Sequence, residues 1–340
     1  MAIGIKDVAR LAGVSPATVS RVLSGGIVSE KLQQRVCAVI EEIGYRPNLS
    51  ARRLRAQKND TIGLIIADIR NPFFTAFARK IDDEAQKNAQ RVILCNTDEN
   101  PEQELACLRL MEEENVAGVI LAPTLSTLKN PQILPSRRPI MFIDRPPIQK
   151  IHDAVIIDNE EASAKLVNHL YGKGYKNILC LYGASSATGF EREKGYGKAV
   201  KKLGLPSFSI PVKHAIGEVE RALQPLLSGI ISPDALIVTN GVLALKVASL
   251  LLKEKIQVPD HLALACFDDE PWMQLIFNGI TTIAQPIKQI AELAHKGLTR
   301  RMRETKNPIN HVVLKGKLII RGSTQNIKDK HPRPYDLKIL

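Results

Sequence analysis

A run of basic residues at positions 46–58 is the part of this 340-residue sequence whose chemistry is easiest to interpret. It holds five cations and no acid, and the cations are Arg46, Arg52, Arg53, Arg55 and Lys58. Like charges at this density repel one another in free solution, but together they attract a polyanion such as nucleic acid. Residues 1–60 carry ten Lys and Arg against five Asp and Glu, so they hold +5 of a formal net charge of +12. This excess favours electrostatic steering of the amino-terminal part toward DNA.

The residues before this run, 5–23, predict two short helices joined by a tight turn. Apolar residues recur at i, i+3 and i+4 in both helices: Val8, Leu11 and Ala12, then Val19, Val22 and Leu23. Gly13 can adopt the positive φ that ends the first helix, and Ser15 can cap the second. Pro16 then takes the first helical position, where no amide hydrogen is needed. Helix, glycine turn and helix form the helix-turn-helix arrangement of DNA-binding proteins, although other small helical domains contain the same corner.

Residues 29–55 extend this pattern. Ser29 can cap a third helix that Gly44 closes, and its apolar side holds Leu32, Val36, Val39, Ile40 and Ile43. After it come Tyr45-Arg46-Pro47-Asn48 and then Ala51-Arg52-Arg53-Leu54-Arg55. In this order of motifs the sequence resembles the N-terminal headpiece of the LacI/GalR family of transcriptional regulators, named after the lactose and galactose repressors.

The resemblance implies a role on DNA for individual residues. Pro16, Ala17 and Arg21 take the base-reading positions of the recognition helix, where an arginine can make paired hydrogen bonds to guanine and the other two offer apolar contact. Contacts to phosphates would come from Ser15, Thr18 and Ser20. In that family the segment equivalent to 47–60 folds into a hinge helix on operator DNA, with Leu54 as a wedge in the minor groove and Ala51 allowing two hinge helices to approach. The remaining expected DNA contacts are Asn48, Arg52 and Arg55.

Beyond residue 60 the sequence alternates short apolar runs with helical patterns. The runs cover residues 62–67, 91–96, 117–122, 139–144, 153–158, 177–183, 234–239, 262–268 and 279–284. The helical stretches include 73–88, 103–115, 159–173, 242–255 and 287–301. Continuous apolar strands separated by helices predict parallel sheets covered on both faces, and the alternation restarts near residue 160. We therefore predict an all-α helix-turn-helix headpiece followed by an α/β periplasmic-binding-protein-like core of two parallel-sheet subdomains.

The predicted domains are a headpiece at 1–46, a hinge and linker at 47–60, and an effector-binding and dimerisation core at 61–340. Within the core, the first lobe would take about 61–158 plus 286–321, and the second about 159–285 plus 322–340. The chain would therefore cross between the lobes near residues 158, 285 and 321. The last ten residues contain no leucine heptad. A homodimer is therefore expected rather than a tetramer, and its twofold symmetry implies a pseudo-palindromic operator.

Polar residues follow several predicted strands, and ligands of such sheets bind beyond the carboxyl ends of the strands. Any one of these residues could simply cap the next helix. Taken together, they match the positions where that family holds a small molecule between its lobes. The resemblance assigns effector binding to Asn71, Phe73, Phe74, Asp144, Arg192, Asn240, Asp268 and Trp272. The expected effector is a sugar, a sugar acid or a sugar phosphate.

Alternatives remain open for some of these residues. Arg192 could clamp a carboxylate or a pair of hydroxyls, or it could lie on the surface beside Glu191 or Glu193. Trp272 could stack on a sugar ring or only cover the edge of its lobe. Asn240 and Gly241 stand where the family usually has Asn-Asp, and the missing carboxylate would favour a more anionic ligand such as a sugar acid.

The sequence contains few features that are typical of other classes of protein. The five cysteines are widely spaced without a CxxC, which predicts free thiols rather than disulfides or a zinc site. No Walker loop, HExxH or GxSxG occurs, so neither an enzyme nor a cofactor or metal is expected. An export signal and an apolar run of the ~20 residues that a membrane span needs are both missing. We therefore expect a cytoplasmic, ligand-responsive repressor rather than a sugar-binding transport protein or a sugar-metabolising enzyme.

Overall fold

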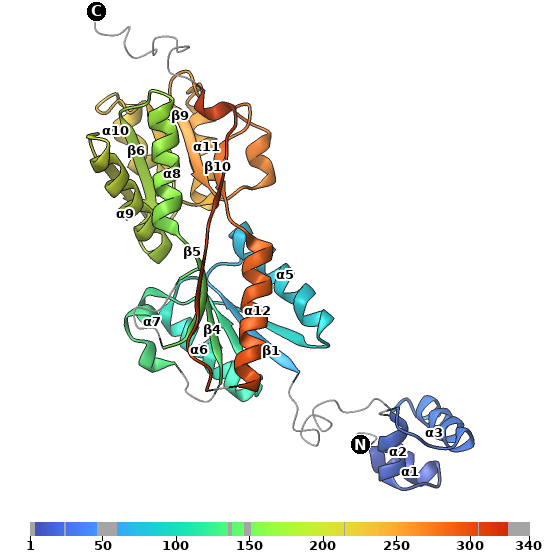
Figure 1. Cartoon of the computed structure of the whole chain (residues 1–340). Helices are drawn as coiled ribbons and strands as arrows, with labels where there is room; N and C mark the ends of the chain where they lie inside the picture. The colour runs from blue at the N-terminus through green and yellow to red at the C-terminus, as the bar shows by residue number, and fades with distance from the viewer. Residues whose placement is uncertain are drawn as a thin grey trace, which may run out of the picture. The chain divides into compact units, whose positions relative to one another are not determined.

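The computed structural model describes residues 4–45 except 24, and residues 60–325 except 135–137, 146–150, 214 and 305. The chain divides into two compact units, Met1–Asn59 and Asp60–Leu340. Figure 1 shows both units and labels many of their elements. The predicted hinge residues lie outside the described part of the chain, and these are Asn48, Ala51, Arg52, Leu54 and Arg55.

The described part of the first unit contains the helices α1 (Ile5–Leu11), α2 (Pro16–Leu23) and α3 (Glu30–Glu42). The turn between α1 and α2 forms as predicted. Gly13 has a φ of +60°, and the Thr18 amide donates a hydrogen bond to Ser15 Oγ at 3.1 Å. Gly44, with a φ of +62°, ends α3, and Ser29 occupies its cap position without a capping hydrogen bond from the side chain. Local backbone preferences therefore account for the boundaries of these helices.

Among the described residues of this unit, the buried core is a small cluster of Val8, Ala9, Ala12, Val19, Val36 and Tyr45. The prediction was wrong at Leu11, whose side chain is 53% exposed. Positions 5, 8, 9 and 12 fall within one narrow stripe of a helix with 3.6 residues per turn, and position 11 lies outside it. Ala9 is buried instead, since it belongs to that stripe.

The first lobe of the second unit is a six-stranded parallel sheet between layers of helices (Figure 1). In spatial order its strands are β11 (His311–Leu314), β5 (Asp153–Ile157), β4 (Ile140–Ile143), β3 (Val119–Leu121), β1 (Thr61–Ile66) and β2 (Arg91–Asn96). Its helices are α5 (Pro72–Lys87), α6 (Pro101–Glu113), α7 (Leu125–Lys129), the short η1 (Pro131–Ile133) and α12 (Ile287–Arg303). Residues of α5 and α12 pack on one face of the sheet and residues of α6 on the other.

The second lobe repeats this architecture with its own six-stranded sheet. The spatial order is β12 (Lys317–Ile319), β10 (Thr281–Ala284), β9 (Ala263–Phe267), β8 (Ala235–Val238), β6 (Ile178–Gly183) and β7 (Phe208–Val212), and only β12 runs antiparallel to its neighbour. Its helices are α8 (Asn159–Gly172), α9 (Ala187–Lys202), α10 (Glu218–Leu227), α11 (Gly241–Lys253), η2 (Pro271–Gln274) and η3 (Gly322–Thr324). The two lobes confirm the predicted core of two parallel-sheet subdomains.

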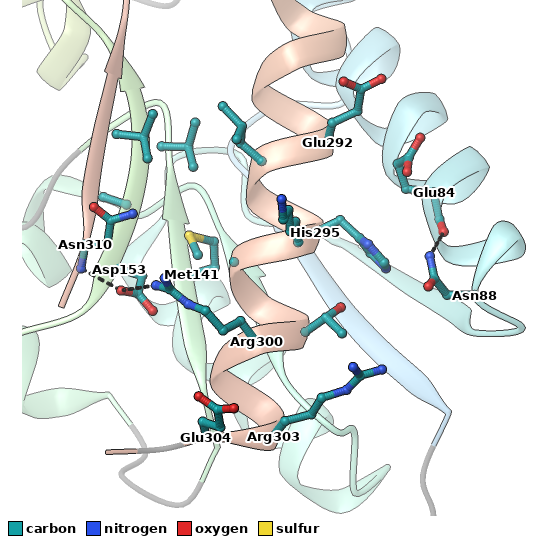
Figure 2. Close-up of a pocket in the computed structure, with 17 residues that line it drawn as sticks. Glu84, Asn88, Met141, Asp153, Glu292, His295, Arg300, Arg303, Glu304 and Asn310 are labelled. Carbon is teal, nitrogen blue, oxygen red and sulfur yellow. Dashed lines mark hydrogen bonds and ion pairs between the residues drawn. The ribbon is translucent and has the colours of Figure 1, made fainter. Parts of the chain in front are cut away.

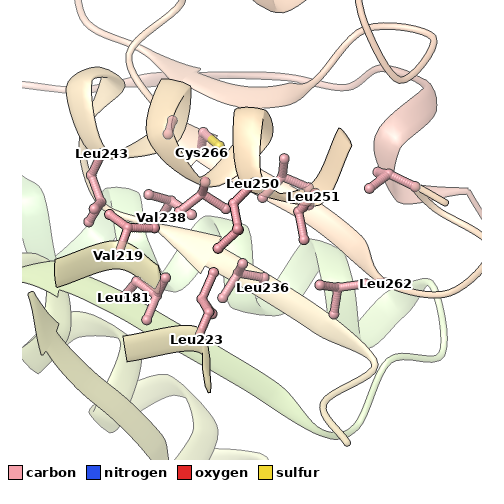
Figure 3. Close-up of a cluster of buried hydrophobic side chains, with 14 of the residues drawn as sticks. Leu181, Val219, Leu223, Leu236, Val238, Leu243, Leu250, Leu251, Leu262 and Cys266 are labelled. Carbon is pink, nitrogen blue, oxygen red and sulfur yellow. The ribbon is translucent and has the colours of Figure 1, made fainter. Parts of the chain in front are cut away.

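Buried side chains hold each sheet between its helices. In the second lobe, α10 and α11 face the sheet across a cluster that includes Leu181, Leu236, Val238, Val219, Leu223, Leu243 and Leu250 (Figure 3). Residues of α8 and α9 cover the opposite face. Burial on both faces explains why the central strands appear in the sequence as continuous apolar runs.

Three of the twelve strands in the described part of the chain were missed in the sequence: β7, β11 and β12. All three lie at an edge of a sheet. An edge strand keeps one side open to solvent, and each of these contains residues that are exposed or only partly buried. Their apolar runs are therefore too short to be distinguished from loops.

The prediction that the chain crosses between lobes near residue 321 was wrong. β11 ends at Leu314 in the first sheet and β12 begins at Lys317 in the second, so the crossing lies at Lys315 and Gly316. A Cβ at position 316 would lie 2.4 Å from Cγ2 of Ile283, so glycine lets the crossing chain approach β10 closely. Residues 317–321 therefore belong to the second lobe.

Candidate functional site

A cleft between the two lobes gathers side chains that follow the carboxyl ends of strands in both sheets. Seven of the eight predicted effector residues line it: Asn71, Phe73, Phe74, Asp144, Arg192, Asn240 and Asp268. Further lining residues include Asp68, Glu99, Arg145, Ser185, Ser186, Thr188 and Gln285. The enclosed volume is about 80 Å³, smaller than the ~300–1,000 Å³ of most ligand pockets. The lobes are therefore closely apposed, and a sugar could enter only if they separate or side chains rearrange.

Two asparagines cap helices at the cleft. Asn71 Oδ1 accepts a hydrogen bond from the Phe73 amide at 3.0 Å, and Asn240 Oδ1 accepts one from the Leu243 amide at 2.7 Å. Both residues also line the cleft. An asparagine can therefore cap a helix and also face the cleft. Its Oδ1 accepts the capping hydrogen bond, while its side-chain nitrogen, Nδ2, can donate to a ligand.

Two aspartates occupy matching positions in the two lobes. Asp144 follows β4 with a φ of +65°, and Asp268 follows β9 with a φ of +68°. The left-handed backbone is unusual for residues other than glycine and is enriched at functional sites. Asp268 accepts hydrogen bonds from the Gly241 amide at 2.9 Å and from Gln285 Nε2 at 2.6 Å. Burial raises the pKa of Asp144, which makes an ion pair with Nε of Arg145 at 3.3 Å.

Arg192 lines the cleft and is 3% exposed. Its Nε donates to Oδ1 of Asn159 at 2.7 Å and its Nη1 donates to the Thr239 carbonyl at 2.6 Å. The guanidinium carbon lies 4.3 Å from the centre of the Phe267 ring. These partners are all neutral, and burial lowers the pKa of Arg192. The structure therefore favours the buried clamp over the surface ion pair with Glu191 or Glu193.

Arg145 is a second buried arginine at the cleft, and no effector contact was predicted for it. Its guanidinium forms a two-pronged ion pair with Glu99, in which Nη1 donates to Oε2 at 2.7 Å and Nη2 donates to Oε1. Nη1 also donates to the Pro123 carbonyl at 3.0 Å. Burial alone would lower the pKa of Arg145, but Glu99 and Asp144 hold it above its ordinary value. Its place directly after a strand was the signal that could have identified it.

The aromatic residues divide between the cleft and the protein core. Phe73 and Phe74 meet edge to face, with ring centres 5.0 Å apart, and both line the cleft. Trp272 does not line the cleft: its Nε1 donates to Oε2 of Glu270 at 2.5 Å, and its ring packs against the second-lobe core. The structure therefore supports the alternative in which Trp272 covers the edge of its lobe, and not the predicted contact with an effector.

A larger cavity, of about 840 Å³, lies on the first lobe beside α12 (Figure 2). Its charged lining residues are of both signs and include Glu84, Glu292, Lys296, Arg300, Arg303 and Glu304. Asp153, also in its lining, accepts hydrogen bonds from Arg301 Nε at 2.8 Å and Nη2 at 2.9 Å. The residues around this cavity come from one lobe only and include none of the predicted effector residues. The interlobe cleft is therefore the better candidate for the effector site.

The headpiece presents its predicted DNA-reading residues on the open side of α2. Exposed residues among them are Ser15, Pro16, Ala17, Ser20 and Arg21, and Thr18 is half-buried. Val19, on the other side of the helix, is fully buried. Ser15 Oγ and Thr18 Oγ1 lie 3.0 Å apart, so the two hydroxyls share a hydrogen bond at the start of the helix. This arrangement suits a helix whose first turn contacts DNA.

Comparisons with known proteins fit both parts of the molecule. Residues 4–48 match the family described as bacterial regulatory proteins, lacI family, and residues 167–324 match a periplasmic binding protein-like domain. The transcriptional regulator PtxS of Pseudomonas putida is 33% identical over 337 residues, which cover 94% of this chain and 96% of PtxS. The ribose operon repressor of Halalkalibacterium halodurans is 30% identical, with 94% of this chain and 97% of that repressor covered. The chain belongs to the LacI family.

The same fold occurs in the crystal structure of the Lac repressor dimer bound to operator and the anti-inducer ONPF. The TM-score is 0.84 at 22% identity, and the match covers 96% of this chain and 100% of the other. As a LacI-family member, this protein is a DNA-binding transcriptional regulator and not an enzyme, which confirms those two predictions. Among the residues that the structure describes, no helix is both long enough and apolar enough to cross a membrane.

Proposed function

We propose that this LacI-family member represses carbohydrate or sugar-acid catabolic genes and that a small molecule bound between its lobes changes its affinity for operator DNA. The observation that carries the proposal is the meeting of Arg192 with Asp144 and Asp268 in one cleft. A guanidinium and two carboxylates can bind several sugar hydroxyls at once, and the guanidinium can bind the carboxylate of a sugar acid. The name of the related ribose operon repressor supports a sugar-linked role.

The effector would act by shifting a population between two arrangements of the lobes. In one arrangement the hinge segments of two subunits pair and insert Leu54 into the minor groove, while Arg52, Arg53 and Arg55 contact phosphates. Effector binding changes the angle between the lobes and therefore the spacing of the hinges. The resulting change in DNA affinity corresponds to a coupling free energy of about 1–3 kcal/mol.

The proposed assembly is a homodimer that binds a pseudo-palindromic operator. Each headpiece would read one half-site, and the half-sites would lie about one helical turn apart. Because its target is chromosomal DNA, we place the regulator in the cytoplasm.

A thermal-shift screen of the full chain against aldoses, aldonates, uronates and sugar phosphates tests the proposal. A compound at a hundred times its dissociation constant should stabilise the protein by roughly 2.7 kcal/mol, which raises the melting temperature measurably. The compound with the largest shift is then added to a titration with genomic operator fragments. A change in operator affinity shows whether it releases or promotes DNA binding.

Variants of two arginines, Arg192 and Arg221, test whether a compound from the screen binds in the cleft. Arg192→Met removes the buried guanidinium and should abolish the thermal shift, and Arg192→Lys should weaken it. Arg221→Met is the control, since Arg221 is exposed on α10 and pairs with Glu218. An equal shift in the Arg192 variants and the control would contradict an effector site in the cleft. If the folded protein showed no shift with any compound, a sugar effector would be ruled out for the tested classes.

A further inference from the structure

Glu270 is a buried acid behind the wall of the interlobe cleft. It lies in the turn after β9, two residues beyond Asp268, and is 8% exposed. Its Oε2 accepts the hydrogen bond from the Trp272 indole at 2.5 Å, while its Oε1 is buried with no hydrogen-bond partner among the residues that the structure describes. Burial raises the pKa of Glu270, and the nearby charge of Asp268 raises it further. A buried oxygen without a partner lowers stability, so a reason for this acid has to be sought outside folding.

The unpartnered oxygen points at Gly241, the first residue of α11. A Cβ built at position 241 would lie 1.9 Å from Glu270 Oε1 and 2.9 Å from its Cδ. The carboxyl group of Glu270 therefore fills the place that a side chain at 241 would occupy. This carboxyl group comes from a different segment of the chain and lies directly beside position 241.

Gly241 connects Glu270 to the cleft. The Gly241 amide donates the hydrogen bond to Oδ2 of Asp268, and the neighbours of Gly241, Asn240 and Val242, both line the cleft. A displacement of Gly241 by a few tenths of an ångström would change how Asp268 and Asn240 face a ligand. Glu270 itself is not among the lining residues, so its influence has to pass through Gly241.

We propose that Glu270 is a positioning residue of the effector cleft: its carboxyl group, anchored by Trp272, holds the first residue of α11 so that the Gly241 amide stays on Asp268. The proposal rests on the proposed function of the cleft. It also gives Trp272 a role, because the indole fixes the carboxyl group in place rather than stacking on an effector. Residue 241 has to be glycine as long as Glu270 occupies this position.

Variants at positions 270 and 241 test whether Glu270 positions Gly241 or only fits into the space beside it. Glu270→Ala removes the support, and Gly241→Ala forces the carboxyl group aside. In both variants, and equally in the double variant, the amides at the start of α11 should exchange hydrogen about tenfold faster in the ligand-free protein. The affinity for the compound with the largest shift in the screen above should fall about tenfold. Glu270→Gln, which keeps the shape and an acceptor for Trp272, should retain most of the affinity.

The matched control is Gly197→Ala in α9, where an added Cβ meets no atom within 4 Å. It should leave exchange at α11 and compound affinity unchanged. The melting temperature of Glu270→Ala should stay the same or rise, which distinguishes positioning from a purely structural role. Full recovery of exchange and affinity in the double variant would overturn the proposal, because the loss in Gly241→Ala would then come from the clash alone. The exchange measurement needs no ligand, so it tests Glu270 even if no compound in the screen binds.

Discussion

The headpiece and the interlobe cleft both use arginines and small polar side chains, but in opposite surroundings. Arg21 is exposed on a helix that belongs to a unit with one small core cluster. Arg192 is buried and hydrogen-bonded to neutral oxygens between two large lobes. A DNA duplex is too large for a protein domain to enclose. The side chains that contact DNA are therefore exposed to solvent, and their binding depends on long-range electrostatic attraction. A small effector can be enclosed, and out of water each polar contact to it is stronger.

The two units also differ in how charge contributes to their stability. In the headpiece, Arg10 and Asp7 form an ion pair at 3.4 Å in which both side chains are exposed. In the first lobe, Arg301 meets Asp153 at 2.8 Å, and the aspartate side chain is only 1% exposed. Exposed pairs contribute little, whereas breaking a buried pair leaves a charge without a partner. Stability of the core should therefore depend on single charged residues, and that of the headpiece should not.

The largest expected effect follows from Arg301. Arg301→Met removes from the buried Asp153 its close ion pair and the two hydrogen bonds from the guanidinium. We expect the core to lose about 3–5 kcal/mol of stability, as in other broken buried pairs. Urea unfolding followed by the fluorescence of Trp272, the sole tryptophan, measures this loss in the core.

Arg300 provides the matched control for this measurement. It is the preceding residue on α12, its side chain is 44% exposed, and its Nη2 lies 4.0 Å from Asp153. Arg300→Met should cost less than about 1 kcal/mol. Equal losses in the two variants would show that burial of the Arg301 pair is not what matters.

The pH dependence of the same pair gives the second prediction. Burial raises the pKa of Asp153, but the hydrogen bonds from Arg301 and the Asn310 amide, together with the positive charges, bring it below its ordinary value of 3.8. A pKa lowered by folding adds stability that is complete above the unfolded value and is lost as the pH falls through the folded value. The stability gap between the parent protein and Arg301→Met should therefore be constant from about pH 7 to 5 and shrink below about pH 4.

Urea unfolding of both proteins at several pH values measures this gap. Other carboxylates titrate in both proteins alike, so they cancel in the difference. A gap that stays the same down to pH 3 would contradict the assignment to Asp153.

The third prediction addresses DNA reading. Arg21→Ala should cost about 1–3 kcal/mol at one base position in each half-site and leave other positions unaffected. Binding titrations with single-base variants of the operator measure this. Arg10→Ala is the control on α1, and its loss should be small and uniform. If Arg21→Ala weakened binding equally at every sequence, Arg21 would be a phosphate contact instead.

The smallest effect is expected at Leu11. Because its side chain is largely exposed, Leu11→Gln should change the stability of the headpiece by no more than about 0.5 kcal/mol. Val8→Ala, at a fully buried position in the same helix, should destabilise it clearly more. Thermal unfolding of the full chain, followed by helical circular dichroism, compares the two. A larger loss in Leu11→Gln would place Leu11 in the core after all.

Prediction from the sequence succeeded where structure depends on near neighbours. The glycine turn, the cap at Ser15 and the central strands follow from backbone preferences and apolar spacing within a few residues. The errors arose where packing decides. Leu11 fell outside a narrow stripe, three edge strands had short apolar runs, and the last crossing depends on contact between Gly316 and Ile283.

The candidate site shows the same division. The family resemblance identified seven residues that do line the cleft. Asp144, Asn240 and Asp268 among them closely follow strands, and parallel strands direct their carboxyl ends to one edge, whereas Arg192 lies within α9. The sequence did not indicate that Arg145 pairs with Glu99 or that Glu270 fills the space beside Gly241. These pairs join residues 46 and 29 positions apart along the chain, on segments that meet only after the strands have taken their order.

By itself, the sequence determined the family, the helix-turn-helix headpiece, the alternation of strands and helices, and the residues available at the strand ends. Each of these depends on short-range spacing or on a motif that stays within one segment. Only the tertiary structure decided which charges neutralise one another, that Arg192 is buried, and that Trp272 holds Glu270 instead of facing the cleft. The physical reason is that the burial of a polar side chain and its hydrogen-bond or ion-pair partners depend on the order of the strands and on packing between distant segments. A local sequence pattern contains no information on either.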